Sequence, residues 1–286
     1  MISARTGVLC VIGNPIEHSM SPKMHNAAIT ALDLDLVYMA FNVPPGRLEG
    51  AIAGIKALGI IGANVTIPHK INVMQYLDEI HPLARNIGAV NTITNVDGVL
   101  LGSNTDGLGA MKALKECNVE LDGMNIVIAG AGGAARALGF TLAPEVSRIS
   151  ILARRERKSK QLARDIKMAN DSTDVEGFSM APSIITRQVR SCDLFINATP
   201  VGMHPNESEC ILENDWLQPN TCVFDLVYNP LETKLLEMAK AIGCKIVHGL
   251  DMLVYQGAVA FESWTGICPP ISSMKQAALV ALDNRK

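Results

Sequence analysis

A glycine-rich turn between an apolar strand and a helix constrains the fold of this chain more than any other feature. Residues 130–135 read Gly-Ala-Gly-Gly-Ala-Ala and fit the pattern G-x-G-x-x-G/A. The turn follows the apolar run 126–129 and opens a helical pattern that reaches residue 142. In that context backbone N–H groups at a helix N-terminus can approach a pyrophosphate. The turn therefore predicts a dinucleotide site, with a tight-packing glycine turn as the alternative. Its residues would be Gly130, Ala131, Gly132, Gly133 and Ala134.

The end of the next predicted strand, 148–153, indicates which nucleotide binds. Arg154 and Arg155 stand where an NAD site usually has an acidic residue. A guanidinium group pairs with phosphate through two hydrogen bonds and can stack on adenine. The two arginines therefore favour NADP. The alternative is a solvated basic helix start, and Glu156 weakens the case for NADP slightly.

Strand and helix patterns alternate along the chain, which predicts an α/β protein with parallel strands covered on both faces. Asp97-Gly98 between two strand patterns predicts a hairpin. Residues 171–176 are polar and predict a loop. The last two helical patterns have no strand of their own, so we expect them to return to the first α/β unit. Further strands are expected at 8–12, 36–43, 60–67, 193–198, 222–227 and 244–247, and helices at 21 onward, 47–58, 68–77, 106–117, 156–168, 231–242, 252–261 and 271–282.

Composition excludes several classes of function. The formal net charge of −3 gives no basic field for a nucleic acid. Seven scattered cysteines without a C-x-x-C pair predict buried reduced thiols and a cytoplasmic location. No apolar run reaches about 18 residues, so no membrane span is expected. His18, His25 and His69 lack metal-ligand spacing, which predicts no metal site.

Two polar clusters outside the nucleotide fold suggest chemistry. Residues 64–70 run from a strand into a predicted helix, where Asn64 and Thr66 share one side. Lys70 would lie in the first helical turn, where the helix dipole lowers the pKa of an ammonium group. Asp106 opens another predicted helix. A lysine beside a carboxylate can relay the hydroxyl proton that alcohol oxidation releases. Taken singly, Asp106 could be only a helix cap and Lys70 only a surface cation.

Ser19 and Ser21 precede a predicted helix, with Ser21 as its N-cap and Pro22 in its first turn. Two hydroxyls at a helix N-terminus suit a carboxylate or a sugar-like ligand. The alternative is a simple cap with an incidental second serine.

Taken together and in order, these stretches resemble the shikimate dehydrogenase family over nearly the whole chain. The resemblance is carried by residues 11–22, 64–70, 88–92, 104–107, the Gly130 turn, 197–203, 225–230 and 255–258. It implies NADP-dependent interconversion of 3-dehydroshikimate and shikimate, with Lys70 and Asp106 as the catalytic pair and Ser19 and Ser21 on the substrate carboxylate. It further implies substrate contacts from Asn64, Thr66, Lys70, Asn91, Asp106, Tyr228 and Gln256, and cofactor contacts from Arg154, Arg155, Lys158, Thr199, Met203 and Gly249.

The resemblance also implies a domain arrangement. An N-terminal substrate domain, 1–106, would be completed by the C-terminal helices, 250–286, and a Rossmann-type NADP-binding domain would span 107–249. The partner would be a small-molecule substrate, with no nucleic acid and no membrane, in a monomer or homodimer. The sequence departs from the family at Ala153-Arg154-Arg155, where Asn-Arg-Thr is frequent. Only Arg154 carries over directly, and Arg155 or Lys158 would supply the other contact.

Three alternatives stay open at this point. A quinate or dual quinate/shikimate dehydrogenase shares the fold and the Lys-Asp pair. A non-catalytic NADP-binding sensor would need the Gly130 turn but not Lys70, Asp106 or the paired serines. An amino-acid-dehydrogenase-like enzyme of the same architecture would lack the serine pair and the 64–70 cluster.

Overall fold

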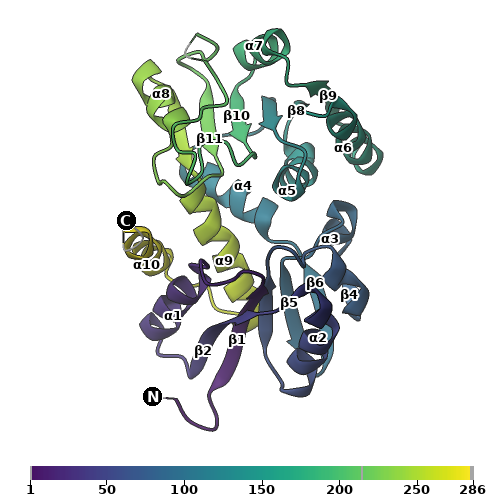
Figure 1. Ribbon diagram of the computed structural model, residues 1–286, viewed down its shortest axis with the longest axis vertical. Helices are drawn as coiled ribbons and strands as arrows, with labels where there is room; N and C mark the ends of the chain where they lie inside the picture. The colour runs from purple at the N-terminus through teal and green to yellow at the C-terminus, as the bar shows by residue number, and fades with distance from the viewer. Residues whose placement is uncertain (1, 214, 284–286) are drawn as a thin grey trace. The chain divides into compact units, whose positions relative to one another are not determined.

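A computed structural model describes residues 2–213 and 215–283 and divides the chain into two compact units (Figure 1). Unit 1 contains Met1–Gly109 and Val254–Lys286, and unit 2 contains Ala110–Leu253. Both boundaries fall inside helices, α4 (Asp106–Glu116) and α9 (Gly249–Thr265). The C-terminal helices therefore belong to the same unit as the N-terminal strands.

Unit 1 is built on a six-stranded mixed sheet in the order β2-β1-β3-β5-β6-β4. β1 pairs in parallel with β2 and β3, whereas β5 runs antiparallel to β3 and β6. The predicted hairpin is confirmed, because Asp97 and Gly98 turn between β5 and β6 with φ values of 50° and 85°. The strands are β1 (Gly7–Gly13), β2 (Leu36–Asn42), β3 (Gly62–Val65), β4 (Glu79–Ile80), β5 (Thr92–Val96) and β6 (Val99–Ser103).

Helices of unit 1 cover this sheet, and α9 is tied to it by a tryptophan. The indole Nε1 of Trp264 donates to the Ile93 carbonyl at 2.9 Å. Gly62 on β3 lies against the same indole, since a Cβ there would be 2.2 Å from Nε1. α10 packs on α1. The helices are α1 (Ser21–Ala31), η1 (Pro45–Arg47), α2 (Leu48–Ala57), η2 (Asn72–Tyr76), α3 (Pro82–Ile87) and α10 (Ile271–Asp283).

Two local predictions in unit 1 are wrong. The helix expected over 68–77 is a turn followed by the short 3-10 helix η2. The Lys70 carbonyl accepts from the Val90 N–H at 2.8 Å, so it is not paired within a helix, and the helix-dipole argument for Lys70 fails. At α1 the N-cap is Met20, and Ser21 is already the first helical residue. Ser19 accepts the Ser21 N–H at 3.3 Å.

Unit 2 is a six-stranded parallel sheet in the order β12-β11-β10-β7-β8-β9. Read from the β9 edge, this is the 3-2-1-4-5-6 order of a doubly wound dinucleotide-binding fold. The strand order reverses direction between β7 and β10, and such a switch point is where these folds bind ligands. The strands are β7 (Asn125–Ala129), β8 (Arg148–Ala153), β9 (Asp174–Ser179), β10 (Leu194–Asn197), β11 (Cys222–Asp225) and β12 (Lys245–His248).

The loop predicted at 171–176 is wrong, because β9 begins at Asp174. β9 is an edge strand, and its outward carboxylates Asp174 and Glu176 pair with Arg148, which explains its polar sequence. β4, α3 and α7 were not predicted. The helices of unit 2 are α5 (Gly133–Leu142), η3 (Ala143–Glu145), α6 (Glu156–Ala169), α7 (Pro182–Arg190) and α8 (Lys234–Ile242).

All seven cysteines are free thiols, and Cys268 is exposed rather than buried as expected. No helix in the described part of the chain has the length and apolarity that crossing a membrane requires.

The contact between Gly62 and Trp264 gives a stability prediction. Gly62→Ala places a methyl group on the indole, so we expect a loss of about 1–3 kcal/mol from overpacking. Gly54→Ala is the matched control in the same unit, because a Cβ at Gly54 meets nothing within 4 Å inside α2. It should add about 0.5–1 kcal/mol through helix propensity. Thermal unfolding of both variants measures the effects, and a Gly62→Ala melting temperature at or above that of the parent would contradict the packing argument.

Candidate active site

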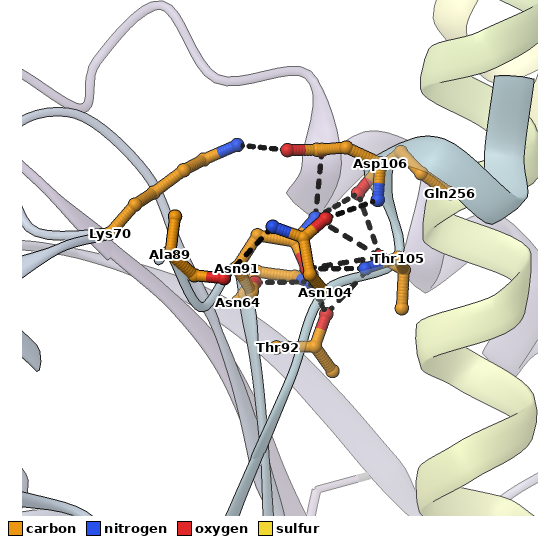
Figure 2. A network of polar contacts seen from close by, with 9 residues as sticks. All are labelled: Asn64, Lys70, Ala89, Asn91, Thr92, Asn104, Thr105, Asp106 and Gln256. Atoms are coloured by element: carbon orange, nitrogen blue, oxygen red, sulfur yellow. Dashed lines mark hydrogen bonds and ion pairs between the residues drawn. The ribbon is translucent and has the colours of Figure 1, made fainter. Parts of the chain in front are cut away.

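The predicted lysine and carboxylate meet in unit 1. The Lys70 Nζ lies 2.6 Å from the Asp106 Oδ2, although the two residues are 36 positions apart (Figure 2). The lysine comes from the turn after β3 and the aspartate from the first turn of α4. Their side chains are 29% and 13% exposed, so the ion pair is shielded yet accessible to a small molecule.

Asn91, just before β5, organises the polar groups around this pair. Its Nδ2 donates to the Asp106 Oδ1 at 2.8 Å and lies 3.1 Å from the Thr105 hydroxyl. Its Oδ1 accepts from the Thr105 N–H at 2.8 Å and from the Thr92 hydroxyl at 3.0 Å. Both oxygens of Asp106 therefore have a donor, and the carboxylate has a defined orientation.

Three further amides complete the network in Figure 2. Gln256 of α9 presents Oε1 3.4 Å from the Asn91 Nδ2. Asn64 of β3 donates to the Asn91 carbonyl at 3.3 Å. Asn104 accepts the Asp106 N–H at 3.1 Å and so holds the first residue of α4. The structure thus brings together Asn64, Lys70, Asn91, Asp106 and Gln256 of the predicted set, while Asn104 was not assigned a site role.

The serines connect to this network through a residue that was not predicted. Ser21 is buried beside Tyr38 of β2, and the Tyr38 hydroxyl donates to the Asn64 Oδ1 at 2.6 Å. The alternation of β2 could have marked Tyr38, because a buried tyrosine needs a partner for its hydroxyl. Ser19 is half-buried and sits one residue before the N-cap of α1. Thr66 follows β3, and its methyl group lies over Gly13.

The glycine turn of unit 2 fits a pyrophosphate. Gly130 has a φ of 121°, and a Cβ there would be 2.7 Å from the Ala198 carbonyl oxygen on the neighbouring strand end. α5 begins at Gly133, and its N-cap Gly132 offers no side-chain acceptor to the first N–H groups. A Cβ at either glycine would meet nothing within 4 Å, so the space beside these N–H groups is open to an anion.

A buried polar network supports the next loop along this edge. Asn197 accepts from the Thr199 N–H and hydroxyl at 3.1 and 2.7 Å, and donates to the Asp225 Oδ1 at 2.9 Å. The Thr233 hydroxyl donates to the Asp225 Oδ2 at 2.6 Å. Asp225 has no cation beside it in this network, and burial raises the pKa of its carboxyl to about 6. The network fixes the backbone at Thr199.

The remaining predicted residues lie in unit 2. Arg154, Arg155 and Lys158 are exposed after β8. Met203 is 46% exposed, and Gly249 approaches the Leu226 carbonyl so closely that a Cβ would be 2.4 Å away. Tyr228 follows β11, so it belongs to unit 2, whereas the other predicted substrate residues belong to unit 1. Among the described residues no cluster of His, Cys, Asp or Glu could hold a metal.

Comparison with known proteins places the sequence among named relatives. Residues 11–93 match the family model "Shikimate dehydrogenase substrate binding domain", and residues 249–279 match "Shikimate 5'-dehydrogenase C-terminal domain". The shikimate dehydrogenase (NADP(+)) of Methanocaldococcus jannaschii is 50% identical over 280 residues, 98% of each chain. A solved shikimate dehydrogenase in complex with NADP+ superimposes with a TM-score of 0.92 at 47% identity, covering 99% of this chain and 98% of that one. The enzyme from Listeria monocytogenes, solved with shikimate and NAD, has a TM-score of 0.92 at 39% identity, covering 96% and 97%.

The carboxyl of Asp225 predicts a pH dependence of stability. The native carboxyl holds its proton up to about pH 6, whereas an unfolded aspartate releases it near pH 4. The stabilisation from this group is therefore complete below about pH 4 and is lost as the pH rises to about 6, on the order of 3 kcal/mol in total.

Asp225→Asn should remove this part of the pH profile. Chemical unfolding of both proteins at several pH values between 4 and 7 measures it, with the exposed Asp122→Asn as the matched control in unit 2. Parallel profiles for Asp225→Asn and the parent would refute the assignment.

Proposed function

The chain belongs to the shikimate dehydrogenase family, and from that premise we propose which of its residues carry out the reaction. The protein is an NADP-dependent oxidoreductase that interconverts 3-dehydroshikimate and shikimate, a step of aromatic amino acid biosynthesis. The observation that carries the assignment of residues is the 2.6 Å contact between Lys70 and Asp106, braced by Asn91.

Oxidation of a secondary alcohol removes a hydride from carbon and a proton from oxygen. NADP+, when bound, accepts the hydride. In the reverse direction Lys70 donates a proton from Nζ to the carbonyl oxygen, and Asp106 orients the ammonium group and stabilises its charge. Asn91 keeps the carboxylate turned toward Lys70, so the proton donor is positioned before the substrate arrives.

Unit 1 supplies the substrate site in this proposal, and its match to a substrate-binding domain model supports that role. Ser19 and Ser21 hold the carboxylate beside the N-terminus of α1, where the helix dipole favours an anion. The ring hydroxyls are recognised by amide and hydroxyl groups, so an analogue that lacks a hydroxyl leaves a buried group without a partner. These groups are Asn64, Thr66, Asn91, Asp106 and Gln256.

Unit 2 supplies the cofactor site. The N–H groups of Gly130–Ala134 hold the pyrophosphate. Arg154 binds the 2′-phosphate of NADP after β8, with Arg155 or Lys158 providing a second cation. Thr199, Met203 and Gly249 stand at or near the carboxyl ends of β10 and β12 and contact the nicotinamide half. Location in the cytoplasm and assembly as a monomer or homodimer stay predictions of the sequence.

Loss of the lysine ammonium should abolish most turnover. We expect Lys70→Ala to lower kcat by roughly 10²–10⁴-fold, the range of general acid–base catalysis, with KM for shikimate within a few-fold. The assay follows NADPH absorbance with shikimate and NADP+, and quinate and NAD+ serve as comparison substrates. Lys115→Ala on the exposed side of α4 is the matched control. A Lys70→Ala kcat within a few-fold of the parent would exclude the proposed role, and faster turnover of quinate would move the substrate assignment to the quinate branch.

Arg154 should determine the choice of nicotinamide cofactor. Arg154→Ser removes a charge-assisted contact worth about 1.5–3 kcal/mol, so KM for NADP+ should rise roughly 10–100-fold while KM for NAD+ changes little. Arg157→Ser, on the same exposed helix start, is the control. Equal changes for both nucleotides would show that Arg154 does not contact the 2′-phosphate.

A further inference from the structure

Tyr38 links the two ends of the proposed substrate site. Its side chain is 2% exposed on the edge strand β2, and its hydroxyl proton is donated to the Asn64 Oδ1 at 2.6 Å. Ser21, in the first turn of α1, lies beside Tyr38. The Tyr38 side chain therefore stands between the N-terminus of α1 and the end of β3.

Asn26 of α1 holds the backbone of Tyr38 in place. Asn26 donates its Nδ2 to the Tyr38 carbonyl at 2.8 Å and accepts the Tyr38 N–H at 2.9 Å. β2 has no neighbouring strand on that side, so the amide of Asn26 takes the backbone groups that a strand would otherwise pair. The backbone of Tyr38 is thereby fixed to the helix that carries Ser21.

The ring of Tyr38 is fixed by stacking. The imidazole of His25 lies parallel to it, with centroids 4.2 Å apart and planes 6° from each other. Neither nitrogen of His25 has a hydrogen-bond partner among the described residues, and burial lowers the pKa of the imidazole to about 3, so the ring is neutral. The ring of Trp264 also lies near the tyrosine, with the two ring centroids 6.1 Å apart. Burying an imidazole without a hydrogen-bond partner costs free energy. The stacking contact of His25 with Tyr38 holds the tyrosine ring in one orientation.

The consequence for Asn64 is a fixed amide orientation. Its Nδ2 donates to the Asn91 carbonyl and to the Thr92 hydroxyl, both at 3.3 Å, and its Oδ1 accepts from Tyr38. A carbonyl oxygen accepts two hydrogen bonds, so one acceptor position on Oδ1 is left for a substrate hydroxyl. Tyr38, whose backbone is bonded to Asn26, thereby ties that acceptor to α1, the helix that carries Ser21.

We propose that Tyr38 is a positioning residue that holds the carboxylate-binding Ser21 and the hydroxyl-binding Asn64 in one fixed arrangement. It makes recognition of the two ends of the substrate interdependent. This inference rests on the proposed function, in which Ser21 and Asn64 bind the hydroxylated acid.

The test is Tyr38→Phe, which removes the hydroxyl and retains the ring. The neutral hydrogen bond to Asn64 is lost, so KM for shikimate should rise roughly 3–10-fold, while kcat and KM for NADP+ stay within about twofold. Tyr76→Phe in η2, also in unit 1, is the matched control and should leave all three constants unchanged. An unchanged KM for shikimate in Tyr38→Phe overturns the proposal, because a tyrosine that only fills the core would change stability and not this constant.

A double-mutant cycle tests the coupling itself. Asn64→Ala combined with Tyr38→Phe should raise KM by less than the product of the two single effects, because both remove the same hydrogen bond. A combined effect equal to the product shows that Tyr38 acts independently of Asn64 and overturns the proposal.

A second variant keeps the test decisive if Tyr38→Phe does not fold. Asn26→Ala releases the Tyr38 backbone and should raise KM for shikimate severalfold at unchanged KM for NADP+, and no change would contradict the inference. If the parent protein does not oxidise shikimate, the proposed function itself fails. If the parent oxidises shikimate and the Tyr38 and Asn26 variants have the same KM for shikimate as the parent, this inference alone fails.

Discussion

The hydrogen bond from Asn91 to Asp106 is the interaction on which the candidate site depends. A half-buried carboxylate beside an ammonium group loses much of its hydration, and the charge attraction compensates only if the geometry is good. Asn91 provides that geometry by holding the Asp106 Oδ1 at 2.8 Å and leaving Oδ2 for Lys70. The opposite end of the amide is itself fixed by Thr92 and Thr105. The orientation of the Asp106 carboxylate is therefore fixed by the uncharged amide of Asn91.

The register of the mixed sheet brings these side chains together. β3 pairs with β5 so that Asn64 stands opposite Thr92, and β5 pairs with β6 so that Thr92 stands opposite Ser103. The carboxyl ends of β3 and β6 consequently meet the beginning of β5, and the polar residues at these three chain positions become neighbours. A one-residue slip would turn every side chain of the moved strand to the other face. The hairpin turn at Asp97-Gly98 fixes this register with two residues of positive φ.

Local sequence signals predicted the parts of this fold that local chemistry decides. The Asp-Gly hairpin and the glycine turn after β7 follow from backbone conformations that few residues adopt. The turn at Lys70 could not be predicted in this way, because the Lys70 carbonyl accepts a hydrogen bond from the Val90 N–H, which is 20 positions away in sequence. β9 was missed because an edge strand exposes charged residues that resemble a loop. Tyr38 escaped notice because its role depends on three elements, α1, β2 and β3, that only the folded chain brings together.

Each unit has an aspartate in its polar network, and the two carboxyl groups differ in whether a cation lies beside them. Asp106 faces the ammonium group of Lys70 and is 13% exposed, so a charged carboxylate there has a cation and access to a ligand. Asp225 accepts hydrogen bonds from Asn197, Thr233 and the Val227 N–H in a fully buried position. Three neutral donors orient this carboxyl but do not offset its desolvation, which is why burial raises its pKa. A carboxyl buried in this way braces a loop, whereas the carboxylate of Asp106 stays accessible to a small molecule beside its cation.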